Sequence, residues 1–273
     1  MDESKTRTLG PRIAVGLGLG GVFLLSLLHP LGFTTLAAVV AALAVRELRV
    51  VLRAAGWHVP TAAPVAAAVV VFATYLYGPV GQWFSLIGSV AVLLVWRVTH
   101  IAISKTKTTA KQLLRDLGAS GFAQVYVPLL ISFAVLIVRG EHGTALVLGL
   151  VVTVVMIDTF GYLVGRFFGK TQLIPRISPK KTWEGFLASA VGALVGGLFT
   201  SYLVSAELWF GLVFGVAVLI SSVLGDLSES LIKRDMRVKD MGDVLPGHGG
   251  FMDRIDSLLP SSFVGFALSL WML

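Results

Sequence analysis

The sequence predicts an all-α polytopic integral membrane protein, and three features of the 273-residue chain support this class. Hydrophobic residues make up 56% of the chain and charged residues only 14%, whereas soluble domains carry about 25% charged residues. Several apolar runs reach the roughly 17–25 residues that a helix needs to span a bilayer. These runs are too long for barrel strands. We therefore expect one transmembrane domain over residues 1–273.

About nine transmembrane helices are expected, because the apolar segments cover approximately residues 12–28, 31–46, 62–77, 83–98, 122–138, 143–163, 186–204, 208–224 and 256–272. The polar, basic start Met1–Arg12 leads into the first segment without a clear cleavage site, which favours a retained span over a removed signal peptide. The chain contains no Cys, so disulfides and thiolate chemistry are excluded.

Closely spaced glycines favour tight helix–helix packing rather than a nucleotide-binding loop. They occur in two groups, Gly16, Gly18, Gly20 and Gly21 near the start, and Gly192, Gly196 and Gly197 later in the chain.

The distribution of basic residues indicates the topology. With the N-terminus in the cytoplasm and nine alternating spans, 21 of the 22 Lys and Arg residues lie on the inside, and only Arg139 falls outside. Cytoplasmic loops are enriched in Lys and Arg. We therefore expect the C-terminus outside and every large polar loop inside. This pattern explains the net charge of +7 without a nucleic-acid partner, and the basic, Thr-rich loop 99–121 is expected to anchor at anionic headgroups.

The inside loop 164–185 combines basic residues with a predicted helix start. Ser178 and Pro179 are typical of an N-cap and a first helical position. Exposed amides there, beside Lys180 and Lys181, would form an anion site. A cluster of positive charge that only fixes topology explains the loop equally well.

Asp158 interrupts the apolar run before that loop, and an ionisable group at that depth favours a functional role over a purely structural ion pair. Together with Gly161, Tyr162 and Gly165 it falls on one helical face, which could line a polar cavity.

The segment 226–256 carries 12 of the 37 charged side chains and is the centre of a predicted catalytic region, residues 158–256. Asp226 closes an apolar run, and we expect Ser230, Lys233 and Arg237 to continue its helical face, with Glu229 beside them. Glycines then break the helix, and Asp253, Arg254 and Asp256 open the next one.

A fold that brings Asp226 and Asp253 together would create a carboxylate site for a hard cation. Mg²⁺ prefers carboxylate oxygens and bridges substrate phosphates, and nearby Lys or Arg would hold the transferring group. His248, between glycines, fits an acid/base, a phosphate donor or a simple loop hydrogen bond.

The residues Ser230–Asp256, SLIKRDMRVKDMGDVLPGHGGFMDRID, resemble the signature of the phosphatidate cytidylyltransferases (CDP-diacylglycerol synthases). The pattern runs from Ser through Lys-Arg, Lys-Asp and His-Gly-Gly to Asp-Arg-x-Asp. The upstream block from Asp158 to Gly185, with GRFFGK and ISPKKTWEG, is similar to a second shared region. The N-terminal residues 1–120 carry no motif.

This resemblance implies transfer of a cytidylyl group from CTP to phosphatidic acid, which gives CDP-diacylglycerol and diphosphate at the cytoplasmic face of the cell (inner) membrane. It also implies Mg²⁺ (or Mn²⁺), K⁺ as a second cation, and a homodimer among membrane lipids. With the residue analysis, it gives Asp226 and Asp253 as metal ligands, and Asp256 or Asp158 as further ligands or orienting groups. Phosphates would be bound by Ser178, Lys180, Lys181, Lys233, Arg234, Lys239 and Arg254, and the nucleotide site shaped by His248, Gly249 and Gly250.

Two other functions are compatible with parts of the sequence. A CTP-dependent transferase or kinase acting on another lipid or polyprenol phosphate would share the same apolar groove and basic loops. A cation-coupled transporter would use Asp158 and Asp226 as intramembrane sites, but we find no internal repeat of the kind that transporters show.

Overall fold

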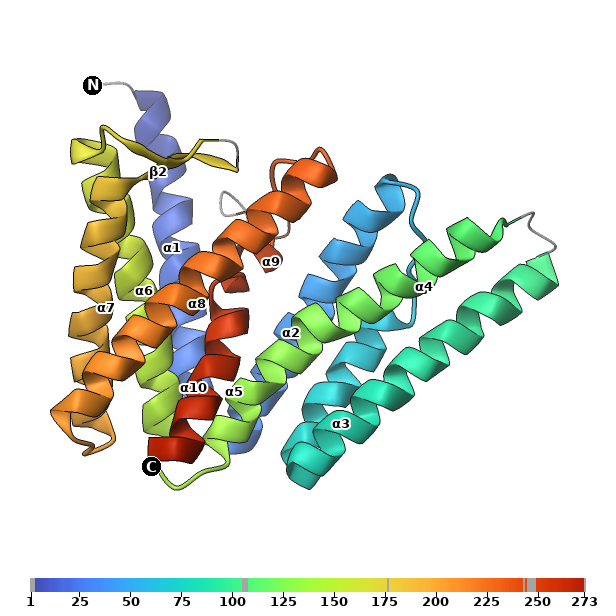
Figure 1. Cartoon of the computed structure of the whole chain (residues 1–273), viewed down its shortest axis with the longest axis horizontal. Coiled ribbons are helices and arrows are strands. Elements are labelled where there is room, and N and C mark those ends of the chain that lie inside the picture. The colour runs from blue at the N-terminus through green and yellow to red at the C-terminus, as the bar shows by residue number, and fades with distance from the viewer. Residues whose placement is uncertain (1–2, 105–107, 176, 243, 245–248, 273) are drawn as a thin grey trace. The chain divides into compact units, whose positions relative to one another are not determined.

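The computed structural model of the chain describes residues 3–104, 108–175, 177–242, 244 and 249–272, and helices dominate it (Figure 1). Five helical stretches are long and apolar enough to cross a membrane: Ala63–Ser104, Ala110–Val138, Gly143–Phe168, Trp183–Leu203 and Leu208–Asp235. The all-α membrane class is thus supported, while the count of nine spans and the orientation of the termini stay predictions. The chain divides into two compact units, Met1–Val135 with Met236–Arg254 and Leu136–Asp235 with Ile255–Leu273.

The first unit is built on α1 (Glu3–Ser26), α2 (Pro30–Ala54), α3 (Ala63–Ser104), α4 (Ala110–Gln124) and the π-helical turn η1 (Val125–Leu129), which continues into α5 (Leu130–Val138). α2 packs against α1 and α3, and α3 against α4 and η1. The predicted spans 62–77 and 83–98 are two arms of α3 (Figure 1). Gly78 separates the arms with φ 66°, a conformation that glycine tolerates, and Pro79 begins the second arm.

The predicted inside loop 99–121 is mostly helix. α3 continues to Ser104, and α4 begins at Ala110 because Thr109 and Gln112 form a reciprocal capping box. The loop expectation was therefore wrong for most of its length, while its role as a headgroup anchor stays a prediction.

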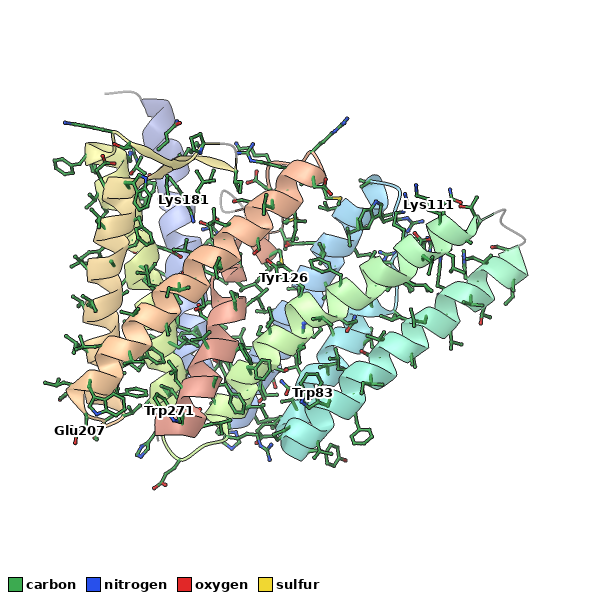
Figure 2. The ribbon with its side chains drawn as sticks, viewed as in Figure 1. Trp83, Lys111, Tyr126, Lys181, Glu207 and Trp271 are labelled. Atoms are coloured by element: carbon green, nitrogen blue, oxygen red, sulfur yellow. The ribbon has the colours of Figure 1, made fainter. Side chains whose placement is uncertain are left out.

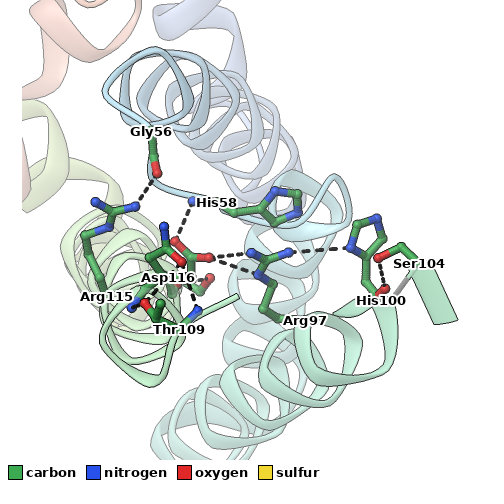
Figure 3. Close-up of polar contacts among 10 residues, drawn as sticks. Gly56, His58, Arg97, His100, Ser104, Thr109, Arg115 and Asp116 are labelled. Atoms are coloured by element: carbon green, nitrogen blue, oxygen red, sulfur yellow. Dashed lines mark hydrogen bonds and ion pairs between the residues drawn. The ribbon is translucent and has the colours of Figure 1, made fainter. Parts of the chain in front are cut away.

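A buried ion pair ties these helices together (Figure 3). Arg97 donates to Asp116 Oδ2 from Nε at 3.0 Å and from Nη2 at 2.6 Å. The His58 amide donates to Asp116 Oδ1 at 2.9 Å. Both side chains of the pair are at least nine-tenths buried, so this cluster fastens the loop after α2 to α3 and α4.

The second unit contains α6 (Gly143–Phe168), β1 (Gln172–Ile174), β2 (Ser178–Thr182), α7 (Trp183–Leu203), α8 (Leu208–Asp235) and α10 (Leu258–Met272). α7 packs against α6 and α8, and α10 packs against α6 and α8. α9 (Met252–Ile255) is a single turn, whose first three residues belong to the first unit and whose last belongs to the second.

Glycines of α7 allow the close contacts of this unit. A Cβ on Gly192 would lie 2.7 Å from Met156 O of α6, and one on Gly197 would lie 2.9 Å from Gly215 Cα of α8. The packing interpretation is confirmed for this group, which also contains Gly196. For the four glycines of α1 no described atom lies within 4 Å of an added Cβ, so close packing at those positions stays a prediction.

The segment around Ser178 does not begin a helix. Ser178–Thr182 forms β2, which pairs antiparallel with β1, and α7 begins only at Trp183. Thr182 provides the N-cap, since its Oγ1 accepts the Gly185 amide at 3.2 Å. The predicted helix N-terminus at Ser178–Pro179 is therefore wrong, while phosphate binding by Ser178, Lys180 and Lys181 stays a prediction.

Candidate functional site

The β-hairpin of the second unit carries Lys181 to α8 (Figure 2). The Nζ atom of Lys181 lies 2.5 Å from Oδ2 of Asp226. The two side chains keep 26% and 32% of their exposure, so solvent and solutes can reach this ion pair. Ser230, one turn further along α8, directs its hydroxyl to Asp226 Oδ1 at 3.4 Å.

Both ends of the hairpin are fixed, which sets the position of Lys181. Arg234 at the end of α8 donates from Nε to the carbonyl oxygen of Ile177 in the turn. Glu184, in the first turn of α7, accepts the amides of Lys170 and Thr171 at 3.1 and 3.2 Å. The role of Arg234 in this structure is therefore to hold the turn, and its binding to phosphate stays a prediction.

A second pair of charges lies one turn along α8. Glu229 is fully buried, and its Oε2 accepts from Lys233 Nζ at 2.6 Å. Removing a carboxylate from water is costly unless it is paired and hydrogen-bonded. Glu229 therefore holds the Lys233 ammonium beside the helix rather than leaving it free to extend.

Asp256 lies in the turn before α10 and completes the acidic cluster of the second unit, which we define as Asp226, Glu229 and Asp256. Burial, followed by the neighbouring Asp226 charge, raises the pKa of the Asp256 carboxyl to about 6, although hydrogen bonds from the Ser257 amide and with Glu229 and the charge of Lys233 oppose the rise. Like charges at close range disfavour joint ionisation. A bound cation would reduce this repulsion and stabilise the ionised form of the carboxyl groups.

Gly225 allows the turn to approach α8. Its Cβ, if present, would lie 2.8 Å from Pro260 Cγ and 3.1 Å from the carbonyl carbon of Asp256. Ser221 and Ser261 add a hydrogen bond of 3.0 Å between α8 and α10. The glycine directly before Asp226 is thus what permits the Asp256 turn to lie against α8.

Asp253 belongs to the first unit and has a different environment. Its Oδ2 accepts the amides of Met241 at 3.0 Å and Gly250 at 2.9 Å. Gly249 has φ +78°, and a Cβ there would lie 3.1 Å from Asp253 Oδ2. Asp253 therefore shapes the Gly249-Gly250 turn, and its predicted convergence with Asp226, which lies in the other unit, stays a prediction.

The remaining predicted site residues are spread over both units. Lys180 is exposed on β2 of the second unit, beside half-buried Ser178. Lys239 and Arg254 are exposed in the first unit. The predicted acid/base or phosphate donor His248 lies outside the described residues.

The predicted helical faces of Asp158 and Asp226 lie on α6 and α8. Asp158 is exposed on α6, whereas Gly161 and Gly165 of the same predicted face lie against Gly185 at the start of α7. Arg237 does not continue the face of Asp226, because α8 ends at Asp235 and Arg237 has φ 57°. That part of the predicted charged helix was wrong.

Glu47 is a polar residue of interest that sequence reasoning missed. It is a buried acid on α2, 3% exposed, and its two oxygens accept the amides of Phe251 and Met252 at 3.0 Å each. The available signal was a single acid at the end of an apolar segment. Its partners, 204 and 205 residues away, become apparent only in the fold.

The donor set of the second unit fits a hard divalent cation. Among the described residues no group of three or more His, Asp or Glu side chains is arranged around an ion position. Mg²⁺, however, is commonly held by one or two carboxylates together with substrate phosphates. Asp226 and Asp256 offer two such carboxylates. The Lys181 ammonium is bound to Asp226, which shows that this carboxylate is accessible to a positive charge.

Comparison with known proteins places these residues in a family. A sequence model of the cytidylyltransferase family matches residues 10–272. The phosphatidate cytidylyltransferase of Mycobacterium bovis is 38% identical over 265 residues, 94% of this chain and 86% of the relative. That of Mycobacterium leprae is 38% identical over 274 residues, 96% and 88%, and that of Thermotoga maritima 34% over 173 residues, 60% and 64%. The chain therefore belongs to the cytidylyltransferase family.

Proposed function

We propose that the chain transfers the cytidylyl group of CTP to phosphatidic acid, forming CDP-diacylglycerol and diphosphate for phospholipid synthesis. The observation that carries this proposal is the partly exposed Lys181–Asp226 ion pair next to Asp256, in a chain that is similar over 94% of its length to a relative with that enzyme name. Acidic and basic groups together are what nucleotidyl transfer requires. We further propose a multi-pass inner-membrane protein, homodimeric, with its site on the cytoplasmic side.

In the proposed reaction, an oxygen of the lipid phosphate attacks the α-phosphorus of CTP. The bond from that phosphorus to the oxygen bridging the β-phosphorus breaks, and diphosphate leaves with the electron pair. The lipid phosphate is already ionised near neutral pH, so the chain needs no strong base. Its own residues must bring two anions together and hold them in line.

Lys181 suits this role because its ammonium is a point charge on a flexible stem. In the proposed complex it moves from Asp226 to a phosphate oxygen, and Asp226 becomes available at the same moment. Lys233, held by Glu229 at 2.6 Å, provides a second, more rigid positive charge. We propose that Asp226 and Asp256 would hold Mg²⁺ (or Mn²⁺). Asp253 as a further ligand of this ion and K⁺ as a second cation stay predictions. When bound, the divalent ion neutralises charge on the phosphates.

Purified protein in detergent tests the proposed substrates. We expect diphosphate and a CDP-lipid only when CTP, phosphatidic acid and Mg²⁺ are all present, without any ion gradient. ATP in place of CTP, or a polyprenyl phosphate in place of phosphatidic acid, should give less than about a tenth of the rate. Faster turnover with the polyprenyl phosphate, or no turnover without a gradient, would contradict the proposal.

A further inference from the structure

Two imidazole rings of the first unit stack near the end of α3 (Figure 3). They belong to His58, in the loop after α2, and His100, in α3, and their centroids lie 5.4 Å apart with an interplanar angle of 27°. Arg97 lies beside them, because its Nη1 donates to His100 Nδ1 at 3.4 Å. None of these residues belongs to a sequence motif or takes part in the proposed reaction, so their arrangement calls for another explanation.

The loop that carries His58 is held by hydrogen bonds from α2 and α4. The His58 amide donates to Asp116 Oδ1 of α4 at 2.9 Å. Arg49 of α2 donates from Nε to the carbonyl oxygen of Val59 at 3.0 Å. The backbone is therefore fixed on both sides of the imidazole, and a ligand that binds this ring does not need to order the loop first.

Positive charge exceeds negative charge around the two rings. Arg53, in the last turn of α2, is exposed, and its charge acts on His58 together with the charges of Arg97 and His100. Of the described groups whose charge acts on His58, only Asp116 is acidic. Asp116 is already bound to Arg97 through Nε and Nη2, so a further anion would find an excess of positive charge here.

Hydrogen-bond donors for an anion are available on these residues. Arg97 can only donate, so His100 Nδ1 accepts from it and the proton of the neutral ring is on Nε2. His100 is exposed and His58 is partly exposed, so solutes can reach both residues. Guanidinium and imidazole N–H groups bind phosphate oxygens well. We call this set the histidine site, and it consists of Arg53, His58, Arg97 and His100.

The surface of α3 that leads to His100 is apolar and exposed. Val92, Trp96 and His100 follow one another at intervals of four residues and therefore lie on one face of the helix. Val92 and Trp96 are 59% and 48% exposed. α3 is long and apolar enough to cross a membrane, and Trp is enriched where a membrane meets water. Acyl chains would cover this face, with a headgroup at the level of His100.

We propose that the histidine site binds the phosphate of an anionic phospholipid whose acyl chains lie along the face of α3 that carries Val92 and Trp96. Arg53 and the two imidazoles contact the phosphate, while Arg97 and its partner Asp116 hold the rings in place. The site differs from the predicted anchor in the loop 99–121, since three of its four residues precede that loop. The inference goes beyond the proposed function and does not depend on it.

The test uses the full chain in detergent and two lipids with identical acyl chains, phosphatidylglycerol and phosphatidylcholine. Phosphatidylglycerol is anionic and is not the proposed substrate, so its binding is measured apart from turnover. Titrations followed by thermal unfolding give an apparent Kd for each lipid, and hydrogen exchange locates the binding. Phosphatidylglycerol should bind about tenfold more tightly than phosphatidylcholine. It should also slow exchange about threefold in peptides covering residues 53–60.

The double variant Arg53→Gln, His100→Gln removes two proposed contacts from exposed positions. We expect its Kd for phosphatidylglycerol to rise about tenfold, to the value for phosphatidylcholine, and the protection of residues 53–60 to disappear. Arg46→Gln is the matched control, since it removes an exposed arginine of the same helix, about 10 Å before Arg53. This control should keep both Kd values within about twofold of wild type.

An undiminished preference for phosphatidylglycerol in the double variant, or an equal loss in Arg46→Gln, would overturn the proposal. Inorganic phosphate at about 10 mM should raise the melting temperature by less than about 1 °C. Equal protection of residues 53–60 by inorganic phosphate would indicate a site for free phosphate and would also overturn the lipid assignment. Should the double variant fail to fold, His58→Gln is expected to lose the same preference, and retention of that preference contradicts the proposal.

Discussion

The carboxylates of Glu47, Asp253 and Asp116 in the first unit and of Asp226 in the second unit are held in two different ways. In the first unit, Glu47 and Asp253 accept backbone amides, and Asp116 is bound by Arg97 and an amide. In the second unit, Asp226 is held by the ammonium of Lys181, with both side chains partly exposed. An amide cannot leave its acceptor unless the backbone moves, whereas a lysine stem exchanges partners readily. The first arrangement maintains shape, and the second leaves both charges available to substrates.

The largest expected effect is that of Asp226→Asn. Removal of this charge abolishes the Lys181 pair and a proposed metal ligand, so turnover should fall at least about 1000-fold, a loss of about 4 kcal/mol in transition-state stabilisation. The melting temperature in detergent should change little, because the pair is partly exposed. Glu207→Gln, at an exposed acid before α8, serves as the control and should keep wild-type turnover. An active Asp226→Asn enzyme would remove Asp226 from the site.

Asp253→Asn distinguishes a structural role of the Asp253 carboxylate in the turn from a role as a metal ligand. A single oxygen of Asp253 accepts both amides, so asparagine can preserve the turn with its carbonyl oxygen. If Asp253 is also a metal ligand, turnover should drop about 300-fold, with unchanged hydrogen exchange at residues 241–252. Full activity with an intact turn would restrict Asp253 to a structural role.

Asp116→Asn should have the reverse profile. It leaves the buried Arg97 guanidinium without its charged partner, which is expected to cost about 3 kcal/mol of stability. Thermal unfolding should begin several degrees lower, while kcat and both KM values of the remaining folded enzyme stay close to wild type. A specific loss of kcat at unchanged stability would show that the cluster of Arg97, Asp116 and His58 in the first unit, here called the first-unit cluster, takes part in chemistry.

Lys181→Ala tests the mobile half of the Asp226 pair. We expect kcat/KM to fall about 100-fold, or about 2.7 kcal/mol, through weaker binding of phosphate groups. Lys181→Arg should recover part of the activity because it retains the charge. Lys111→Ala, an exposed lysine of α4, is the matched control, and unchanged kinetics in Lys181→Ala would exclude this lysine from the site.

The smallest expected effect concerns pH and the first-unit cluster. Burial lowers the pKa of His58 below its usual 6.5, and the positive charge of Arg97 is the next largest cause. His100 and Arg53 lower this pKa further, whereas Asp116 raises it. Because the folded state disfavours the charged form, the stability that His58 contributes above pH 6.5 should be lost as the pH falls below 6.5 and through the lower pKa of the folded state. We expect a decrease of about 2 °C or less in melting temperature between pH 8 and 5. His58→Gln should remove that slope, and an equal slope in this variant would implicate another group.

The sequence predicted the helices well, because long apolar runs and glycine spacing are local signals. It failed at Ser178–Pro179, where the pattern of a helix start is shared by a strand, and pairing with β1 decides the outcome. It could not predict the Lys181–Asp226 pair as such, since both residues appeared only as members of charged loops. The contact arises from a hairpin whose turn is held by Arg234.

The contacts of Glu47 were beyond prediction for a similar reason. A lone acid after an apolar segment is typical of a helix end at the membrane surface. The residues next to Glu47 in the sequence do not indicate its hydrogen-bond partners. The sequence predicts only that Gly242 and Gly250 break the helix, and that Gly250 also shapes the nucleotide site. Their closeness to Glu47 depends on long-range contacts of α2 with Gly242 and with residues 250–252, which no local pattern encodes.

The most direct test of the proposed reaction is to follow the label from CTP carrying ³²P at either the α- or the γ-phosphate, with phosphatidic acid, Mg²⁺ and purified enzyme. Cytidylyl transfer predicts that the α-label enters the lipid product and the γ-label is released as diphosphate. It also predicts that both events disappear together in Asp226→Asn. Entry of the γ-label into lipid, or label transfer by Asp226→Asn at the wild-type rate, would contradict the account.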